Sequence, residues 1–375
     1  MCGGPAPIKM RFLVPHPPEP KAEVTDVGSS APSTPSSSGS TGAPFAALSA
    51  AFSAPETPVH ASYATPEQMM AMSTTAVPPG VVWGLPAAPQ MPPLSLPPFK
   101  TAAAAPRVVV RQVWPHNFEE EAKLIESLLP RFRYAAVDTE FPGTVYRPAA
   151  PAYMLTPEKL YALLKANVDE LDLIQLGLTL FDAGCRLPDL GAGAAVRHVW
   201  EFNFREFDVR RHRHAPESVA MLRAKGVDFG RTRREGVRAA AFGPRLRKWL
   251  RAGLGRAGVV TFSGGYDLAY LVKVMFGPGY KLPATAPEFE AVAKALLRRK
   301  LFDVKEMARH CPSDLRGGLE SVAGKLDVAR AVGEAHQAGS DSLLTCQTFI
   351  KMRERYFDDD KLTMVAGMLG GINAR

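Results

Sequence analysis

Two acids interrupt the apolar stretch Tyr134-Ala135-Ala136-Val137-Asp138-Thr139-Glu140-Phe141-Pro142-Gly143. A short apolar run that ends at Pro and Gly is typical of a buried strand. Residues i and i+2 of a strand face the same side, so the side chains of Asp138 and Glu140 project together. Two desolvated carboxylates repel each other and need cations nearby. These cations could be basic side chains from elsewhere in the chain or divalent metal ions. Alternatively, the strand simply ends here and its two acids face water.

The composition divides the chain into a tail and a body. Of the 34 prolines, 20 fall within the first hundred residues, which carry a formal net charge of −1, whereas the remaining 275 carry +9. Residues 1–105 mix Pro, Ala, Ser, Thr and Gly without apolar periodicity, which predicts a disordered segment. We therefore expect the folded domain at 106–375. Its basic character favours phosphate-rich partners without requiring them.

Several classes of protein are disfavoured. The four cysteines are scattered, without a CxxC pair or histidines at zinc-finger spacing, so the sequence indicates neither a disulfide framework nor a zinc site. No apolar run approaches roughly 18 residues, and the N-terminal apolar run is too short for a secretory segment. We expect an intracellular, soluble protein with no membrane partner.

The remaining pattern predicts strands followed by alternating helices and strands. Strand-like runs at 171–181, 198–204 and 259–262 join the acidic strand, and 301–302 is a candidate short edge strand. Helices are predicted from about residue 118 to 129, where Asn117 is a good N-cap, and at 216–224, 245–254, after Gly265, 288–299, 305–310, 319–326 and 341–357. This order fits a mixed, five-stranded α/β sheet flanked by helices, of the ribonuclease H-like kind.

Other acids stand at helix starts that such a fold could bring near the first pair. Asp267 follows the Gly264-Gly265 loop, and Asp341 begins the last long helix. Each acid, taken alone, is explained as a complement to the helix dipole. Together with Asp138 and Glu140, however, they form the oxygen-rich ligand set that two-metal phosphodiester cleavage uses.

Two further residues near these acids have a predicted role. His336 lies five residues before Asp341, and an imidazole with an ordinary pKa near 6.5 suits the removal of a proton from water. A lone loop histidine is otherwise simply solvated. Asp303 precedes a predicted helix, and we interpret it as a cap instead of a ligand.

Basic residues gather in one part of the body. Between Arg205 and Arg256 there are 15 Lys or Arg against 5 acids. Such a patch would give salt-dependent affinity for nucleic acid; a solvated basic face is an equally good explanation. The G-x-G-x-x-G match at 253–258 ends a helix and precedes a strand, which is the reverse of the dinucleotide-binding arrangement, so we discard it.

Four longer motifs point to a known family. The sequence resembles the Caf/Pop family of deadenylases, the catalytic ribonuclease subunits of the Ccr-Not complex, over about residues 107–372. The likeness is carried by Val137-Asp138-Thr139-Glu140-Phe141-Pro142-Gly143, Ile174-Gln175-Leu176-Gly177-Leu178-Thr179, Trp200-Glu201-Phe202-Asn203-Phe204-Arg205-Glu206-Phe207-Asp208 and His336-Gln337-Ala338-Gly339-Ser340-Asp341-Ser342-Leu343-Leu344-Thr345.

This resemblance implies a DEDD-type 3'-to-5' exoribonuclease that shortens messenger RNA poly(A) tails and works in the cytoplasm and the nucleus. By position, Asp138, Glu140, Asp267 and Asp341 would bind two divalent ions, Mg2+ or Mn2+, and His336 would be the general base. The resemblance also implies binding to poly(A) RNA, to the Ccr-Not scaffold subunit and to a second deadenylase.

The chain also departs from the family pattern. Ser263 stands where the family usually has His in the segment before Asp267. An acidic residue near 211–213 and an Asn near Thr232 are also missing. Two alternatives therefore stay open: a catalytically weak scaffold or partner-binding subunit, and a DEDD exonuclease that acts on other RNA or on DNA.

Overall fold

The computed structural model describes residues 106–370 apart from 152–153, 192, 298–299 and 312–314. The predicted disordered segment at 1–105 lies outside these residues. Within the described part, six strands form one mixed sheet in the order β1-β4-β3-β2-β5-β6. The strands are β1 (Arg107–Val113), β2 (Tyr134–Glu140), β3 (Gln175–Phe181), β4 (Val196–Asn203), β5 (Gly258–Thr261) and β6 (Leu301–Asp303).

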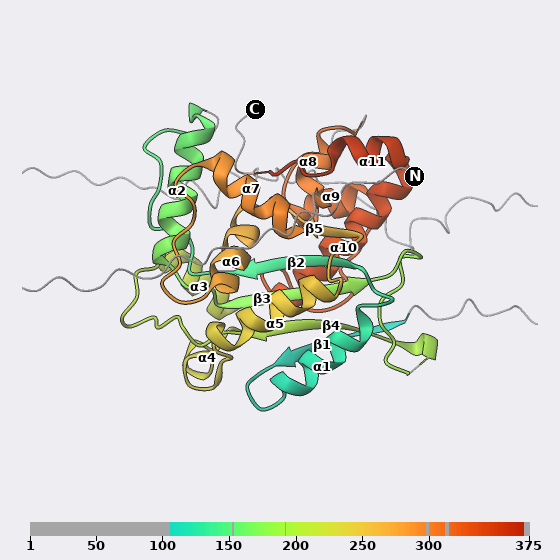
Figure 1. Cartoon of the computed structure of the whole chain (residues 1–375), viewed down its shortest axis with the longest axis horizontal. Coiled ribbons are helices and arrows are strands. Elements are labelled where there is room, and N and C mark those ends of the chain that lie inside the picture. Colours follow the sequence, from blue (N-terminus) through green and yellow to red (C-terminus); the bar gives the residue numbers. More distant parts are fainter. Residues whose placement is uncertain (1–105, 152–153, 192, 298–299, 312–314, 371–375) are drawn as a thin grey trace, which may run out of the picture. The chain divides into compact units, whose positions relative to one another are not determined.

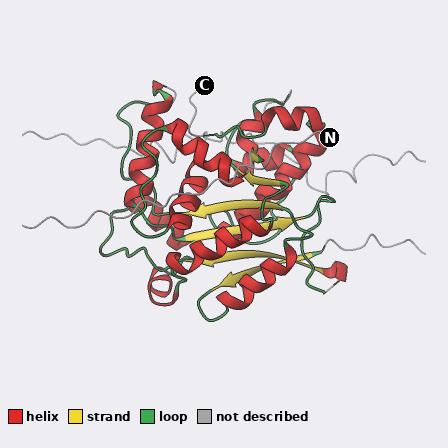
Figure 2. Cartoon of the chain, in the orientation of Figure 1, coloured by secondary structure: helices red, strands yellow, loops and turns green. Residues whose placement is uncertain are grey.

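Helices surround this sheet in the described part of the chain. They are α1 (Phe118–Leu128), α2 (Pro157–Glu170), α3 (Pro216–Ala224), α4 (Phe229–Glu235), α5 (Ala239–Ala252), α6 (Gly265–Phe276), α7 (Ala286–Leu297), α8 (Val304–Ala308), α9 (Leu319–Lys325), α10 (Ala338–Tyr356) and α11 (Asp359–Val365). Figure 2 shows the strands as a central layer between helices. None of these helices combines the length and the apolar character that a bilayer crossing needs.

The order of the strands confirms the predicted mixed sheet but not its strand number. β3 runs antiparallel to β2 and β4, whereas β5 is parallel to β2 and to β6. The additional strand is β1, which pairs in parallel with β4 from Arg107 to Val113. Only Val113 of β1 is buried, so this edge strand lacks the alternation of apolar and polar residues that marks a strand in a sequence.

Each face of the sheet has its own apolar core. On one face, α5 packs on Phe202 of β4 and α6 on β2, with Trp249 and Phe242 of α5 among the fully buried rings. On the other face, α10 packs on β2 and β3 and contributes Phe349 to a second cluster. Figure 1 shows α5 in front of the strands and α10 behind them. The buried α10 is therefore held against the strand that carries the two acids.

Three helices were missing from the sequence prediction. α2 begins after Thr156, whose side chain accepts a hydrogen bond from the Lys159 N–H. α4 lies within a basic run and α11 near the C-terminus, and both are short. In addition, α5 starts at Ala239, six residues before the predicted start, because Pro244 is accommodated inside the helix. Proline removes one helical hydrogen bond, so a helix that contains one is under-predicted from sequence.

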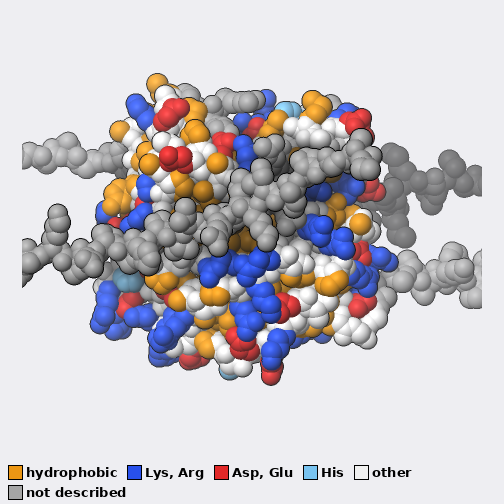
Figure 3. All heavy atoms as spheres, in the orientation of Figure 1, with side chains coloured by type: hydrophobic (Ala, Val, Ile, Leu, Met, Phe, Trp, Pro, Cys, Tyr) orange, Lys and Arg blue, Asp and Glu red, His pale blue; other side chains and the backbone are white. Residues whose placement is uncertain are grey.

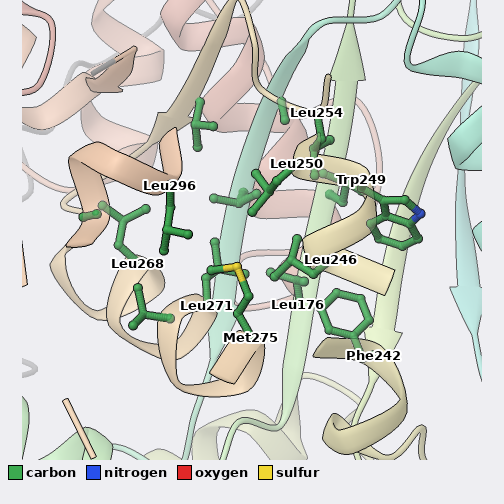
Figure 4. Close-up of a pocket in the computed structure, with 16 residues that line it drawn as sticks. Leu176, Phe242, Leu246, Trp249, Leu250, Leu254, Leu268, Leu271, Met275 and Leu296 are labelled. Carbon is green, nitrogen blue, oxygen red and sulfur yellow. The ribbon is translucent and has the colours of Figure 1, made fainter. Parts of the chain in front are cut away.

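The apolar cavity shown in Figure 4 belongs to the core. Leu246 and Leu250 of α5 face Leu268 and Leu271 of α6 across it, and its lining is carbon apart from the sulfur of Met275 and the ring nitrogen of Trp249. Its volume is about 30 Å³, which is no more than the share of one water molecule in the liquid. It therefore has neither the size nor the polar groups of a substrate site.

Gly177 lies where α10 comes closest to the sheet, so a substitution at this position tests the close packing directly. A Cβ added at Gly177 would lie 1.8 Å from the Ala338 carbonyl oxygen, so the backbones would have to separate. We expect Gly177→Ala to lower the free energy of unfolding by about 1–3 kcal/mol or more in chemical denaturation. Gly324→Ala in α9 is the control: nothing lies near its added Cβ, and it should stabilise by about 0.5–1 kcal/mol. Equal stability of Gly177→Ala and wild type would contradict the close packing.

Candidate active site

The acids of β2 lie where the start of α10 crosses the sheet. Asp138 pairs with Gly177 of β3, and Glu140 pairs with Gln175. Partners in an antiparallel pair present their side chains on the same face. Because Gly177 has no side chain, the Ala338 backbone lies directly over it, and the first turn of α10 brings Asp341 toward the two acids.

Asp267 reaches the same end of β2 from another element. It lies in the first turn of α6, directly after β5, and is 7% exposed. The Thr139 hydroxyl donates a hydrogen bond of 2.6 Å to Asp267 Oδ1. Since Thr139 lies between Asp138 and Glu140 in the sequence, this bond ties the start of α6 to the acidic strand. The fold thus brings Asp267 to the end of β2 from a distant part of the chain.

Asp303 fixes the turn that leads to Asp267. It caps α8 as predicted, accepting hydrogen bonds from the backbone N–H groups of Lys305 and Glu306. The same carboxylate accepts hydrogen bonds of 2.9 Å from the N–H groups of Ser263 and Gly264. Ser263, which replaces the family's histidine, adopts a positive φ of 58°. This turn depends on backbone groups, so the exchange of its side chain leaves the position of α6 intact.

Asp341 has one cationic neighbour that the sequence did not indicate. Arg330 Nη2 lies 2.6 Å from Asp341 Oδ1 and also pairs with Glu320. The backbone N–H of His336 donates a 2.8 Å hydrogen bond to Asp341 Oδ2. Arg330 lies eleven residues before Asp341, in a segment without helical or strand periodicity, so no spacing rule connects the two. The pair became visible only in the folded chain.

His336 completes the group of predicted site residues. Its backbone has a φ of 64°, and its side chain is exposed. One ligand atom each from His336, Glu140 and Asp341 lie within 4.8 Å of one another. The imidazole can thus reach water at the edge of the carboxylate cluster. Its role as a general base and the roles of the four acids as ligands stay predictions.

Burial raises the pKa values of the four carboxylates, and repulsion within the cluster adds to this for two of them. Burial raises the pKa of Asp138 well above its usual value, and the charges of Asp267, Asp341 and Glu140 raise it further. Burial likewise raises the pKa of Glu140, with Asp341 and Asp267 adding to the effect. The pKa of Asp267 rises to about 7, mainly through burial. For Asp341, burial outweighs the opposing effect of Arg330, and its pKa is also raised.

This donor set fits divalent metal ions. Four carboxylates meet a single guanidinium, that of Arg330, among the groups that shift their pKa values in the described part of the chain. Such an excess of buried negative charge is costly, and oxygen ligands of this kind are the ones that Mg2+ and Mn2+ prefer. Asp138, Glu140, Asp267 and Asp341 come from β2, α6 and α10 and can therefore hold ions between them. The alternative in which the β2 acids simply face water is not supported by this packing.

Several of the basic residues at 205–256 form ion pairs. Figure 3 shows Lys and Arg side chains over α4 and α5. Arg245 and Lys248 of α5 pair with Glu126 of α1, and Arg233 lies 3.5 Å from Asp208. Neighbouring acids thus offset part of the positive charge of this patch, on α5 in particular.

A mixed six-stranded sheet with four clustered carboxylates and a neighbouring imidazole defines an exonuclease of the ribonuclease H-like fold. The comparisons with known proteins agree: residues 113–240 match the model of the CAF1 family ribonuclease. The chain is 38% identical over 268 residues to the probable CCR4-associated factor 1 homolog 10 of Arabidopsis thaliana, which covers 70% of this chain and 93% of that protein. The chain belongs to the CAF1 family of ribonucleases.

Other relatives extend this result. The chain is 35% identical over 268 residues to the poly(A) ribonuclease pop2 of Schizosaccharomyces pombe, covering 71% of this chain and 75% of that one. The solved structure of S. pombe Pop2p in its Mg2+ and Mn2+ bound form matches with a TM-score of 0.61 and 35% identity, over 70% of this chain and 99% of that chain. Yeast CAF1 co-crystallised with the NOT1 MIF4G domain has a TM-score of 0.56 at 24% identity, over 70% and 96%, and shows the shared fold.

The raised pKa of Asp267 predicts the sign of a stability change. The pKa of Asp267 is about 7 in the folded chain, whereas that of an aspartate in the unfolded chain is near 3.9. The folded protein therefore loses stability as the pH rises from the lower value to the higher one. We therefore expect Asp267→Asn to raise the melting temperature of the metal-free protein at about pH 8, by roughly 2–4 °C for each kcal/mol of relieved repulsion. The same substitution should reduce the stabilisation that added Mn2+ gives.

Asp208→Asn is the matched control for this measurement. A hydrogen bond from the Arg210 backbone lowers the pKa of Asp208, with Arg233 acting in the same direction. Its carboxylate therefore stabilises the folded chain above its unfolded pKa, and its loss should lower the melting temperature slightly at the same pH. A lower melting temperature for Asp267→Asn would show that burial does not destabilise the ionised Asp267 carboxylate.

Proposed function

We propose that this chain is a metal-dependent 3'-to-5' exoribonuclease that shortens messenger RNA poly(A) tails and releases 5'-AMP. The observation that carries the proposal is the meeting of Asp138, Glu140, Asp267 and Asp341 beside His336. The poly(A) specificity is supported by the relative named poly(A) ribonuclease, which is 35% identical to this chain. Bound cations would offset the negative charge of the four carboxylates, so that the site can accept a negatively charged phosphodiester.

The roles of the residues follow from their positions. Asp138, Glu140, Asp267 and Asp341 would hold two divalent ions, Mg2+ or Mn2+, the two metals bound in the S. pombe Pop2p structure. Such ions supply Lewis-acid stabilisation of the attacking and leaving oxygens. His336 accepts the proton of the attacking water, because its exposed ring stands at the edge of the cluster and an imidazole exchanges protons near neutral pH.

Arg330 and Thr139 position the acids that they touch. Arg330 binds Asp341 Oδ1, and the backbone N–H of His336 binds Oδ2, so both oxygens of this carboxylate have a fixed direction. Thr139 does the same for Asp267. Side chains whose direction is set in advance need less rearrangement when a substrate phosphate arrives.

The proposal includes partners. The names of the relatives, CCR4-associated factor and CAF1 with the NOT1 MIF4G domain, support assembly with a Ccr-Not scaffold subunit and with a second deadenylase. Poly(A) tails occur in both the nucleus and the cytoplasm, so we propose both locations. Residues 1–105 have no part in this proposal.

Removal of the clustered carboxylates tests the activity. With Mg2+ or Mn2+, the purified chain should shorten a 3' oligo(A) tail on a denaturing gel, whereas Asp138→Ala and Asp341→Ala should each lose at least about 100-fold in rate, because each removes part of the metal site. Asp208→Asn, outside the cluster, should keep the wild-type rate. An intact tail with wild-type protein across metals and pH would end the proposal, and equal digestion of oligo(U) or single-stranded DNA would remove its poly(A) specificity.

His336 is tested separately from metal binding. A general base contributes roughly 10²–10⁴-fold to a rate, so we expect His336→Ala to lower kcat by such a factor. Stabilisation by Mn2+ in a thermal shift experiment should remain near the wild-type value. A large loss of Mn2+ stabilisation would instead assign the imidazole to the metal, which its distance from Glu140 and Asp341 also permits.

A further inference from the structure

The loop at 331–337, which leads into α10, places the imidazole of His336. The side chain is exposed, and its ring forms no hydrogen bond with any described residue. The backbone is fixed instead: the residue has a φ of 64°, and its N–H donates a 2.8 Å hydrogen bond to Asp341 Oδ2. The position of this loop therefore decides how close the ring stands to Glu140 and Asp341.

One arginine side chain ties the loop to the start of α10. Arg330 Nη1 donates a 3.3 Å hydrogen bond to the carbonyl oxygen of Glu334 and a second hydrogen bond to Ser340 Oγ. The Ser340 hydroxyl in turn donates a hydrogen bond of 2.5 Å to the carbonyl oxygen of Val332. Two carbonyl groups of the loop are thus held, one by Arg330 directly and the other through Ser340.

The remaining nitrogens of Arg330 bind two carboxylates. Nη2 donates to Asp341 Oδ1 at 2.6 Å and to Glu320 Oε1 at 2.5 Å, and Nε donates to the same Glu320 oxygen at 2.8 Å. A guanidinium has five N–H donors, and each of those of Arg330 now has an acceptor among the described residues. Arg330 therefore keeps no donor for a substrate phosphate, and its role is to position the groups that it holds.

Glu320 is the surface member of this group. It lies in the first turn of α9, and its side chain is 57% exposed, whereas that of Arg330 is 13% exposed. One Glu320 oxygen accepts from two N–H groups of the guanidinium, which sets the rotation of the guanidinium plane. Through this contact, α9 takes part in aiming Arg330 at Asp341 and at the loop.

The loop has further contacts that do not involve Arg330. Gln337 Oε1 accepts a 3.0 Å hydrogen bond from the Glu334 N–H, and Gln337 Nε2 donates one of 3.0 Å to the carbonyl oxygen of Lys225. Lys225 Nζ also lies 3.0 Å from Glu334 Oε2. Because these contacts remain when Arg330 is replaced, such a substitution should loosen the loop without unfolding the chain.

We propose that Arg330 is a positioning residue for the base as well as for the metal ligand: its guanidinium holds the loop at 331–337 against α10 and so keeps the His336 imidazole beside the carboxylates, and Glu320 orients the guanidinium. The inference rests on the proposed function, in which His336 is the general base. A base must lie within hydrogen-bond reach of the water whose proton it takes, so a loosened loop slows the reaction without loss of any reacting group.

Hydrogen–deuterium exchange in EDTA tests this positioning without metal, RNA or activity. Arg330→Lys keeps the positive charge, but an ammonium group cannot span the same acceptors. We expect the amides of 331–337 to exchange at least about tenfold faster than in the wild type, because local opening becomes easier. Amides in the middle of α10, at 345–352, should keep their rates. Unchanged exchange in the loop, or equal acceleration throughout α10, would overturn the proposal.

Reaction rates separate geometry from charge. If Arg330 served only to neutralise Asp341, Arg330→Lys would be close to the wild type and only Arg330→Gln would be slow. We expect both variants to lower kcat by roughly 10- to 100-fold with little change in KM, since a displacement of about 1 Å can cost that much. A wild-type rate for Arg330→Lys would overturn the proposal.

A double variant shows whether Arg330 acts through the base. Arg330→Lys combined with His336→Ala should be no more than roughly threefold slower than His336→Ala alone, because residues that act as one unit are not additive. Losses that multiply in full would show that Arg330 acts independently of His336, which contradicts the proposal.

Glu320 provides a test that does not put the fold at risk. Glu320→Ala should speed exchange in the loop and lower kcat, each by roughly two- to fivefold, as expected for an exposed ion pair. Glu354→Ala is the matched control: Glu354 is 64% exposed and pairs with Lys351 on α10, away from the loop, so both measurements should stay at the wild-type value. Identical behaviour of the two variants would refute the role of Glu320. If the wild type shortens no tail, the proposed function fails, yet the exchange measurement still decides whether Arg330 holds the loop.

Discussion

Mutual repulsion among buried carboxylates is the constraint on which this molecule depends. Asp138 and Glu140 project from one strand, and Asp267 and Asp341 are brought to them by two helices. Burial raises the pKa of each of the four, and the charges of the other acids in the cluster raise it further for Asp138 and Glu140. Breaking the cluster apart would relieve the repulsion, so the remaining fold must hold the elements together against it. The two apolar cores on the faces of the sheet supply this force.

The close approach of α10 to β3 is the geometric condition for the cluster. At Gly177 there is no room for a side chain beneath the Ala338 carbonyl. Any larger residue would lift the first turn of α10 and move Asp341 from the acids of β2. The same turn is held by Glu201, whose Oε2 accepts a 2.8 Å hydrogen bond from the Gly339 N–H. Gly177 of β3 and Glu201 of β4 thus together set the position of Asp341.

The sequence predicted the fold class and proposed a set of site residues, and different signals carried the two. Alternation within β2 identified Asp138 and Glu140, and helix-start positions together with the family motifs identified Asp267, Asp341 and His336. Arg330 was missed because an ion pair across a loop has no periodic spacing. β1 was missed as a strand because an edge strand buries little and so shows no alternation. Asn117 starts α1, but its side chain accepts a hydrogen bond from the preceding Trp114 N–H instead of capping the helix, a choice between two local partners that composition cannot decide.

Glu201 joins the cluster and an amide row, formed by the side chains of Gln112, Asn203 and Gln175, into one structure. One of its oxygens holds the start of α10, and the other fixes the direction of Gln112 and Gln175. A single side chain therefore holds both the turn that carries Asp341 and the direction of the Gln175 amide. Because these contacts share one carboxylate, a shift of α10 would disturb the amides as well as the acids. The candidate active site and the amide row beside it are accordingly parts of one hydrogen-bonded unit, built on the four adjacent strands β1, β4, β3 and β2.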